Sequence, residues 1–170
     1  MSESQKAALI AVEKVAIAFS NEVPPNAIAV FKRNLGASYE RVNQMDKAYI
    51  EYCESFQLDR KNWKTAHCLG AWYRKQIYAR FSEIPKNLQL SEDLISSLQD
   101  FEKTEIVKLL KQSAYWYELK KINKNGEPES WLITIYRCIY QLTKDTEYRE
   151  KADGLEMEKN YFDAVCSQTR

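Results

Sequence analysis

Glycine and proline are scarce in this sequence. The 170 residues include four glycines and four prolines, whereas average usage would give roughly twelve and eight. All-β sandwiches and barrels need many turns that contain these residues, so the scarcity argues against both architectures. It also argues against glycine-rich loops that bind phosphate. The composition therefore favours an all-α protein.

The sequence also lacks an excess of charge of one sign and a long apolar run. Lys and Arg number 25 against 24 Asp and Glu, so no overall basic balance points to nucleic acid. No segment reaches the ~20 apolar residues that cross a bilayer. Ala7–Phe19 is interrupted by Glu13 and Lys14, and no A-x-A site follows it. We interpret it as a buried first helix rather than a signal peptide, and we expect no membrane association.

Residues with metal-binding or nucleophilic side chains are few and widely spaced. His67 is the only histidine, and Cys53, Cys68, Cys138 and Cys166 form no C-x-x-C pair. A zinc site usually needs four Cys or His ligands at short spacings, and no motif of a nucleophile or a phosphate-binding loop is present. We therefore expect no enzyme activity, no metal and no cofactor. Unpaired cysteines at this density are typical of a cytoplasmic protein with reduced thiols.

The pattern that remains is helical along the whole chain. Apolar residues recur with a period of 3.6 in segments that are separated by helix-start signals and turns. We expect Asp46, Ser91 and Ser130 to act as N-caps, and Lys124–Pro128 to form the strongest loop. The predicted helices are about Ala7–Ser20, Asn26–Val42, Asp46–Phe56, Trp63–Phe81, Ser91–Leu98, Glu102–Lys121, Trp131–Leu142 and Thr146–Ala164.

Two of the four glycines lie in matching contexts, 34 residues apart. Leu35–Tyr39 reads LGASY and recurs as LGAWY at Leu69–Tyr73. The period and the L-G-x2-Y pattern resemble the tetratricopeptide repeat, and Ala48 and Tyr52 continue that pattern after the first copy. The second copy departs from it after its first helix, where Ser82 replaces the expected alanine. The resemblance covers about residues 29–81.

The two matching glycines have a physical explanation in this pattern. Glycine inside a helix costs about 1 kcal/mol relative to alanine, so it needs a compensating reason. Close approach of a packed neighbouring helix would supply that reason, with Ala48 as the small residue opposite Gly36. Tyr39 and Tyr73 would then fill the wedge between neighbouring helices.

The resemblance implies stacked antiparallel helix pairs, in an all-α, right-handed solenoid of about eight helices that forms one domain. We expect residues 1–25 to hold an N-terminal capping helix and residues 26–62 to form repeat one. Residues 63–100 would form a divergent repeat two, whose second helix is displaced to about Ser91–Leu98. Residues 101–170 would supply divergent helices and a C-terminal cap.

In such arrays the first helices of the pairs line the concave face, which is the usual ligand groove. Small residues there leave room for a ligand backbone, and basic residues favour an acidic or helical segment of another protein. Ala37 stands where the carboxylate-clamping members of the family have asparagine. A solvated basic face without a ligand is the alternative interpretation. The candidate partner-binding residues are Arg33, Ala37, Glu40, Arg41, Lys64, His67, Ala71, Arg74 and Lys75.

The favoured function is therefore a non-catalytic adaptor or scaffold for protein–protein interaction. The alternative is an RNA-binding or single-strand-binding helical protein, because the basic stretch Arg60–Arg80 contains interleaved aromatic residues that suit phosphate contacts and base stacking. A homo-oligomer is a further possibility, if exposed members of the C-terminal aromatic set form a contact. That set consists of Tyr115, Trp116, Tyr136 and Tyr140.

Overall fold

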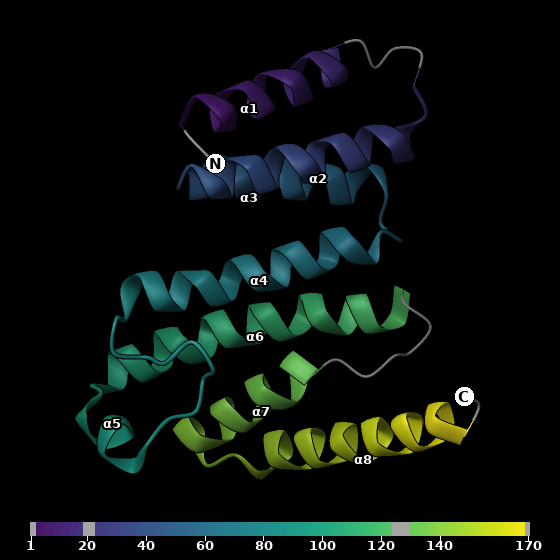
Figure 1. The fold of residues 1–170 in the computed structure, drawn as a ribbon. Coiled ribbons are helices and arrows are strands. Elements are labelled where there is room, and N and C mark those ends of the chain that lie inside the picture. The colour runs from purple at the N-terminus through teal and green to yellow at the C-terminus, as the bar shows by residue number, and fades with distance from the viewer. Residues whose placement is uncertain (1–2, 19–22, 124–129, 169–170) are drawn as a thin grey trace. The chain divides into compact units, whose positions relative to one another are not determined.

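A computed structural model describes residues 3–18, 23–123 and 130–168 of the chain (Figure 1). The described residues form helices and no strand, which confirms the prediction of an all-α protein. The helices are α1 (Glu3–Ala18), α2 (Pro25–Arg41), α3 (Met45–Leu58), α4 (Trp63–Arg80), α5 (Glu92–Ser97), α6 (Asp100–Asn123), α7 (Ser130–Thr143) and α8 (Thr146–Gln168).

Local signals in the sequence mark several helix starts, and the predicted cap Ser91 is confirmed. Pro24 is the N-cap of α2, and Pro25 is its first residue, where a missing N–H and a fixed φ are favourable. The Ser91 side chain accepts a hydrogen bond of 3.2 Å from the Leu94 N–H at the start of α5. Asp145 accepts a hydrogen bond of 3.1 Å from the Glu147 N–H at the start of α8.

Two predicted caps are wrong. Asp46 lies inside the first turn of α3, and the N-cap is Gln44, whose side chain makes no capping hydrogen bond. An acidic residue in the first turn still interacts favourably with the helix dipole. Ser130 is the first helical residue of α7 rather than its N-cap, and its hydroxyl accepts a hydrogen bond from Lys159 at 3.1 Å.

The predicted burial of the first helix stays a prediction, because only some of its side chains are described. Ala7, Ala11 and Val15 are exposed, and Val15 keeps 56% of its surface. The apolar positions expected on its buried face, from Leu9 to Phe19, have side chains that lie outside the described residues. The predicted end of this helix at Ser20 and the loop Lys124–Pro128 also lie outside them.

The chain divides into two compact units, Met1–Trp72 and Tyr73–Arg170. The division falls inside α4, whereas the expected repeat boundaries followed residues 62 and 100. Trp63–Trp72 therefore packs with unit 1, and Tyr73–Arg80 packs with unit 2. A division inside a helix has no turn signal, so no local pattern in the sequence predicts it.

Unit 1 is built on the close packing of α2 and α3, and α1 packs on α2. A Cβ atom placed on Gly36 would lie 3.1 Å from the Ala48 carbonyl oxygen, so Ala48 is opposite Gly36 as predicted. The same Cβ would lie only 2.6 Å from Cε1 of Tyr52, which is fully buried. The glycine therefore makes room for the Tyr52 ring.

A buried hydroxyl pair joins three segments of unit 1. Ser55 on α3 donates a hydrogen bond of 2.6 Å to the Ala29 carbonyl on α2. Its oxygen also lies 3.0 Å from the hydroxyl oxygen of Thr65 on α4. Both hydroxyls are completely buried, so each needs a partner that water cannot supply. The pair fixes α2 and the start of α4 on the same helix, α3.

Unit 2 has one apolar core, to which α4, α6, α7 and α8 all contribute. The segment between α4 and α5 belongs to it as well, because Phe81, Ile84, Leu88 and Leu90 are all buried. The helix α7 lies between α6 and α8 and packs on both (Figure 1). The predicted short helix at about Ser91–Leu98 is confirmed as α5, Glu92–Ser97, with Ser91 as its N-cap and Leu98 as its C-cap.

Candidate functional site

Tyr52 brings together the two helices that carry most of the candidate residues. Its hydroxyl interacts with the Glu40 carboxylate on α2 and with the Cys68 thiol on α4. Burial, and then these two neighbours, raise the pKa of Tyr52 well above its ordinary value. The phenol therefore stays protonated and links the two helices. Ser55 holds the same helices one turn further along α3.

Seven of the nine candidate residues lie in unit 1, next to the contacts of Tyr52. We call this set the basic face: Arg33, Ala37, Glu40, Arg41, Lys64, His67 and Ala71. Arg41 directly follows Glu40, and Lys64 lies one turn before Cys68. Arg41 and Lys64 are exposed, and the other five residues are half-buried.

Arg33, Arg41 and Lys64 of the basic face have no carboxylate partner in the described part of the chain. The Arg33 guanidinium donates to the Asn34 side chain at 3.1 Å, and Lys64 Nζ lies 5.5 Å from the centre of the Trp63 ring. Lys32, on the same helix as Arg33, instead pairs with Glu51 at 3.2 Å and with Glu54. Partial burial lowers the pKa of Lys32, but the two carboxylates outweigh it and the pKa is raised. On α2, therefore, Lys32 has carboxylate partners, whereas Arg33 and Arg41 have none among the described residues.

Arg74 and Lys75, the remaining two candidates, belong to unit 2. The centre of the Arg74 guanidinium lies 3.4 Å from the centroid of the Trp131 ring, and its Nε donates to the Tyr117 hydroxyl at 3.2 Å. A cation stacked on an aromatic face is bound there by the ring quadrupole. Arg74 therefore serves the packing of α4, α6 and α7, which neither the repeat nor the charge pattern signalled. Lys75 is exposed.

The aromatic residues of the basic stretch Arg60–Arg80 are also engaged within their own units. The Trp72 indole donates to the Met45 carbonyl at 2.9 Å, and its ring lies 4.5 Å from that of Tyr49. The Tyr78 hydroxyl donates to the Lys86 carbonyl at 2.8 Å. These rings are held by packing contacts rather than presented for base stacking.

A second group of basic residues lies on α6 (Lys108, Lys111, Lys120 and Lys121), and two of these lysines have acidic neighbours. Arg80 pairs with Glu105 at 2.7 Å, and Lys108 lies 3.8 Å from the same carboxylate. Lys121 pairs with Glu158. Local acidic partners reduce the positive potential that phosphate binding would need.

The described cysteines form no disulfide, and the surroundings of Cys53 and Cys138 disfavour the thiolate. Cys53 and Cys68 are half-buried, and Cys138 is buried. Burial raises the pKa of Cys138 to about 12, and it also raises the pKa of Cys53. A thiol with a raised pKa holds little thiolate at neutral pH. Among the described residues, no group of three or more His, Cys, Asp or Glu side chains is placed to hold a metal ion.

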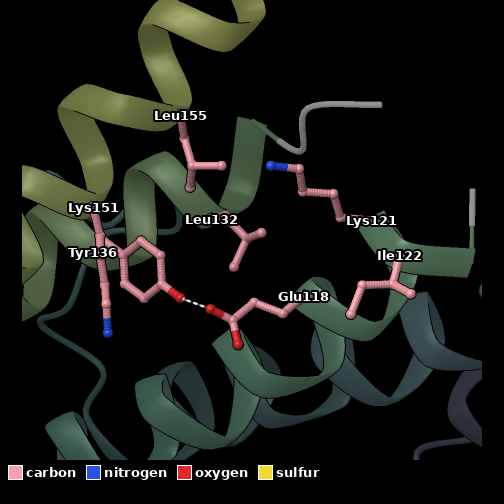
Figure 2. A pocket seen from close by; sticks show the side chains of 7 residues that line it. All are labelled: Glu118, Lys121, Ile122, Leu132, Tyr136, Lys151 and Leu155. Atoms are coloured by element: carbon pink, nitrogen blue, oxygen red, sulfur yellow. Dashed lines mark hydrogen bonds between the residues drawn. The ribbon is translucent and has the colours of Figure 1, made fainter. Parts of the chain in front are cut away.

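Unit 2 contains a pocket that sequence reasoning missed. It has a volume of about 420 Å³ and lies between α6, α7 and α8 (Figure 2). Three separate helices supply its walls, so no contiguous motif marks it. Tyr136 donates a hydrogen bond to Glu118 inside it. We call it the α7 pocket; its lining is Glu118, Lys121, Ile122, Leu132, Tyr136, Lys151 and Leu155.

No family model, curated protein or solved structure matches the chain. None of the helices, within the residues that the structure describes, has the length and apolar character to cross a membrane. The functional inference therefore depends on the chain's own residues and geometry.

Proposed function

We propose that the chain is a non-catalytic, tetratricopeptide-like adaptor or scaffold of the cytoplasm, which binds an acidic or helical segment of another protein on the basic face. The right-handed stacking of its helices and their union in a single domain are part of this proposal. The observation that carries it is the pair Arg41 and Lys64. Both are exposed and lack a carboxylate partner among the described residues, on two helices that Tyr52 and Ser55 hold together.

The small residues of the basic face support the same proposal. Ala37 lies one turn before Arg41, and Ala71 lies one turn after His67. Short side chains next to cations allow a ligand backbone to approach while its carboxylates reach the charges. The close packing of Gly36 against Tyr52 and Ala48 agrees with the helix pairing that the resemblance implies.

The charge contribution to binding can be tested by reversal. An exposed ion pair contributes about 0.2–1 kcal/mol. Arg41→Glu combined with Lys64→Glu removes two attractions and adds two repulsions, so we expect partner affinity to fall by about 1–2 kcal/mol, roughly five- to thirtyfold. Arg74 is unsuitable for this test, because its reversal would also disturb the packing on Trp131.

The experiment is affinity capture from a lysate of the organism that encodes the chain, followed by mass spectrometry of recovered proteins. The matched control is Lys86→Glu with Lys144→Glu, because both lysines are exposed and lie outside the basic face. We expect specific partners to be lost with the first pair of substitutions and kept with the control. Equal recovery from both variants would remove the basic face as the binding site.

Nucleic-acid binding is the alternative proposal and is less favoured, because Trp72 and Tyr78, two of the aromatic residues that suggested base stacking, are engaged within their units. Titration with a labelled single-stranded oligonucleotide at two salt concentrations separates the two. Phosphate-driven binding must weaken steeply as salt rises. Binding of this kind near physiological salt would favour the alternative, and its absence would eliminate it.

A further inference from the structure

The α7 pocket is an apolar hole with an open rim in unit 2. The helices α6 and α8 both pack on α7, which provides the floor of the pocket through the fully buried Leu132. Figure 2 shows Leu155 on the α8 side and Ile122 on the α6 side, with their side chains directed toward the pocket. Its size falls within the 300–1,000 Å³ range of pockets that receive ligands.

Gly154 on α8 has no close packing partner among the described residues. Apart from its chain neighbours and the backbone of its own helix, a Cβ atom at this position would meet no described atom within 4 Å, whereas a Cβ on Gly36 would collide with Tyr52. Glycine in the middle of a 23-residue helix costs about 1 kcal/mol relative to alanine. Glycine is favoured where another backbone approaches closely. The position adjoins the pocket residue Leu155, so such a backbone would lie beside the pocket.

Large apolar side chains are exposed around the same site. Ile122 at the pocket edge is 71% exposed, and Met157 and Tyr161 on α8 are 69% and 74% exposed. Residues three or four apart lie on one side of a helix, so Gly154, Met157 and Tyr161 share a strip of α8. Tyr161 also lies one turn beyond Glu158, which pairs with the pocket residue Lys121.

The polar groups of this surface carry both signs. Lys121 and Lys151 pair with the α8 carboxylates Glu158 and Glu147, and Glu118 accepts from Tyr136. A surface of one sign would favour a partner of the opposite sign. A surface of mixed sign that also contains both an apolar hole and an apolar projection can be complementary to itself, as a two-fold interface requires.

We propose that this surface binds a second copy of the chain. In the two-fold dimer, Tyr161 of each copy enters the α7 pocket of the other, and the two α8 helices approach closely at Gly154. A tyrosine suits this pocket, because its ring is apolar and its hydroxyl needs a polar partner when buried. Glu118 and Lys121 supply such partners at the pocket wall. The dimer is independent of the basic face in unit 1.

The first test is sedimentation equilibrium of the full-length protein over a range of concentrations. We expect a shift from the 20.0 kDa chain to a species of twice that mass. Tyr161→Ala and Ile122→Glu should each raise the dissociation constant at least about tenfold. The control is Phe101→Glu, since Phe101 is equally exposed, at 71%, at the other end of α6. A wild type that stays monomeric up to about 1 mM would overturn the proposal.

The second test asks whether Tyr161 and the pocket meet directly. A mixture of Tyr161→Ala and Ile122→Glu protein retains one intact contact, between Tyr161 of the second variant and the pocket of the first. We expect these two variants to form a heterodimer at least about tenfold tighter than either homodimer. Circular dichroism of each variant confirms that it is folded. Two folded variants that form no heterodimer would show that this contact is wrong.

A third variant separates dimerisation from stability. Gly154→Ala adds a methyl group where a monomer has open space, so the monomer should melt at a higher temperature. The same methyl group should keep the two α8 helices apart and raise the dissociation constant of the dimer. An unchanged dissociation constant would exclude Gly154 from the interface.

Discussion

Replacing Gly36 with alanine should destabilise unit 1, although alanine is the better helix former. Alanine gains about 1 kcal/mol from helix propensity. The new Cβ would lie 2.6 Å and 2.7 Å from two ring carbons of Tyr52 and 3.1 Å from the Ala48 carbonyl oxygen. Tyr52 is 1% exposed and its hydroxyl is held by Glu40 and Cys68, so the ring has little freedom to retreat.

The overpacking should outweigh the gain in propensity. Extra methyl groups forced into a packed core cost about 1–3 kcal/mol, and sometimes more. Because both Tyr52 and a backbone atom would have to move, we take the upper part of that range and expect a net loss of about 1–2 kcal/mol. For a chain of this length, that loss lowers the melting temperature by about 2–8 °C.

The assay is urea denaturation followed by circular dichroism and tryptophan fluorescence. Gly154→Ala is the matched control, because the same substitution meets open space there and should stabilise the monomer by about 0.5–1 kcal/mol. Both proteins should be compared at a concentration at which the wild type is monomeric. A Gly36→Ala protein as stable as the wild type would refute the packing of α2 against α3 described above.

Three further substitutions or labels test contacts that the charge and repeat patterns did not predict. Ser55→Ala leaves the Ala29 carbonyl without its buried donor and should lower the free energy of unfolding by about 1–3 kcal/mol, measured by urea denaturation. Arg74→Ala should cost about 2 kcal/mol through the lost contact with Trp131, and the same titration measures it; no loss would mean that the stacking contributes nothing. In native protein, Cys138 should react with iodoacetamide more slowly than the half-buried Cys68, as peptide mass spectrometry would show. Burial raises the pKa of Cys138 to about 12 in the folded protein, so its thiol ionises at a lower pH in the unfolded chain. The contribution of the buried thiol to the free energy of unfolding is therefore complete below pH ~9. It declines as pH rises from ~9 toward ~12, by at most about 1.4 kcal/mol per pH unit.

Helix positions were predictable because their signals are local. Pro24, Pro25, Ser91 and Asp145 act within one turn of the backbone that they affect. The prediction that Asp46 is an N-cap was wrong, because an acidic residue is as favourable inside the first turn of a helix as at the cap. The packing of Gly36 against Ala48 was also predictable, because a glycine inside a helix requires a close neighbour.

The remaining features depend on residues that are distant in the sequence. Tyr52 joins Glu40 to Cys68 through three helices, and neither charge nor periodicity marks such a link. In the sequence, nothing distinguishes Arg74 from the other cations nearby. Its contacts with Tyr117 and Trp131 form only because α6 and α7 pack next to it in the fold. The α7 pocket likewise arises only from tertiary packing.

The most direct test of the proposed function is site-specific photo-crosslinking from the basic face. Benzoylphenylalanine would replace Ala37 or Ala71 in separate proteins, with the exposed Ala79 as the control position. After irradiation in a lysate, we expect Ala37 and Ala71 to yield the same crosslinked protein, with the crosslinked peptide in an acidic segment, and Ala79 to yield none. Crosslinks that are equal at all three positions, or absent from both face positions, would contradict the proposal that this face binds a partner.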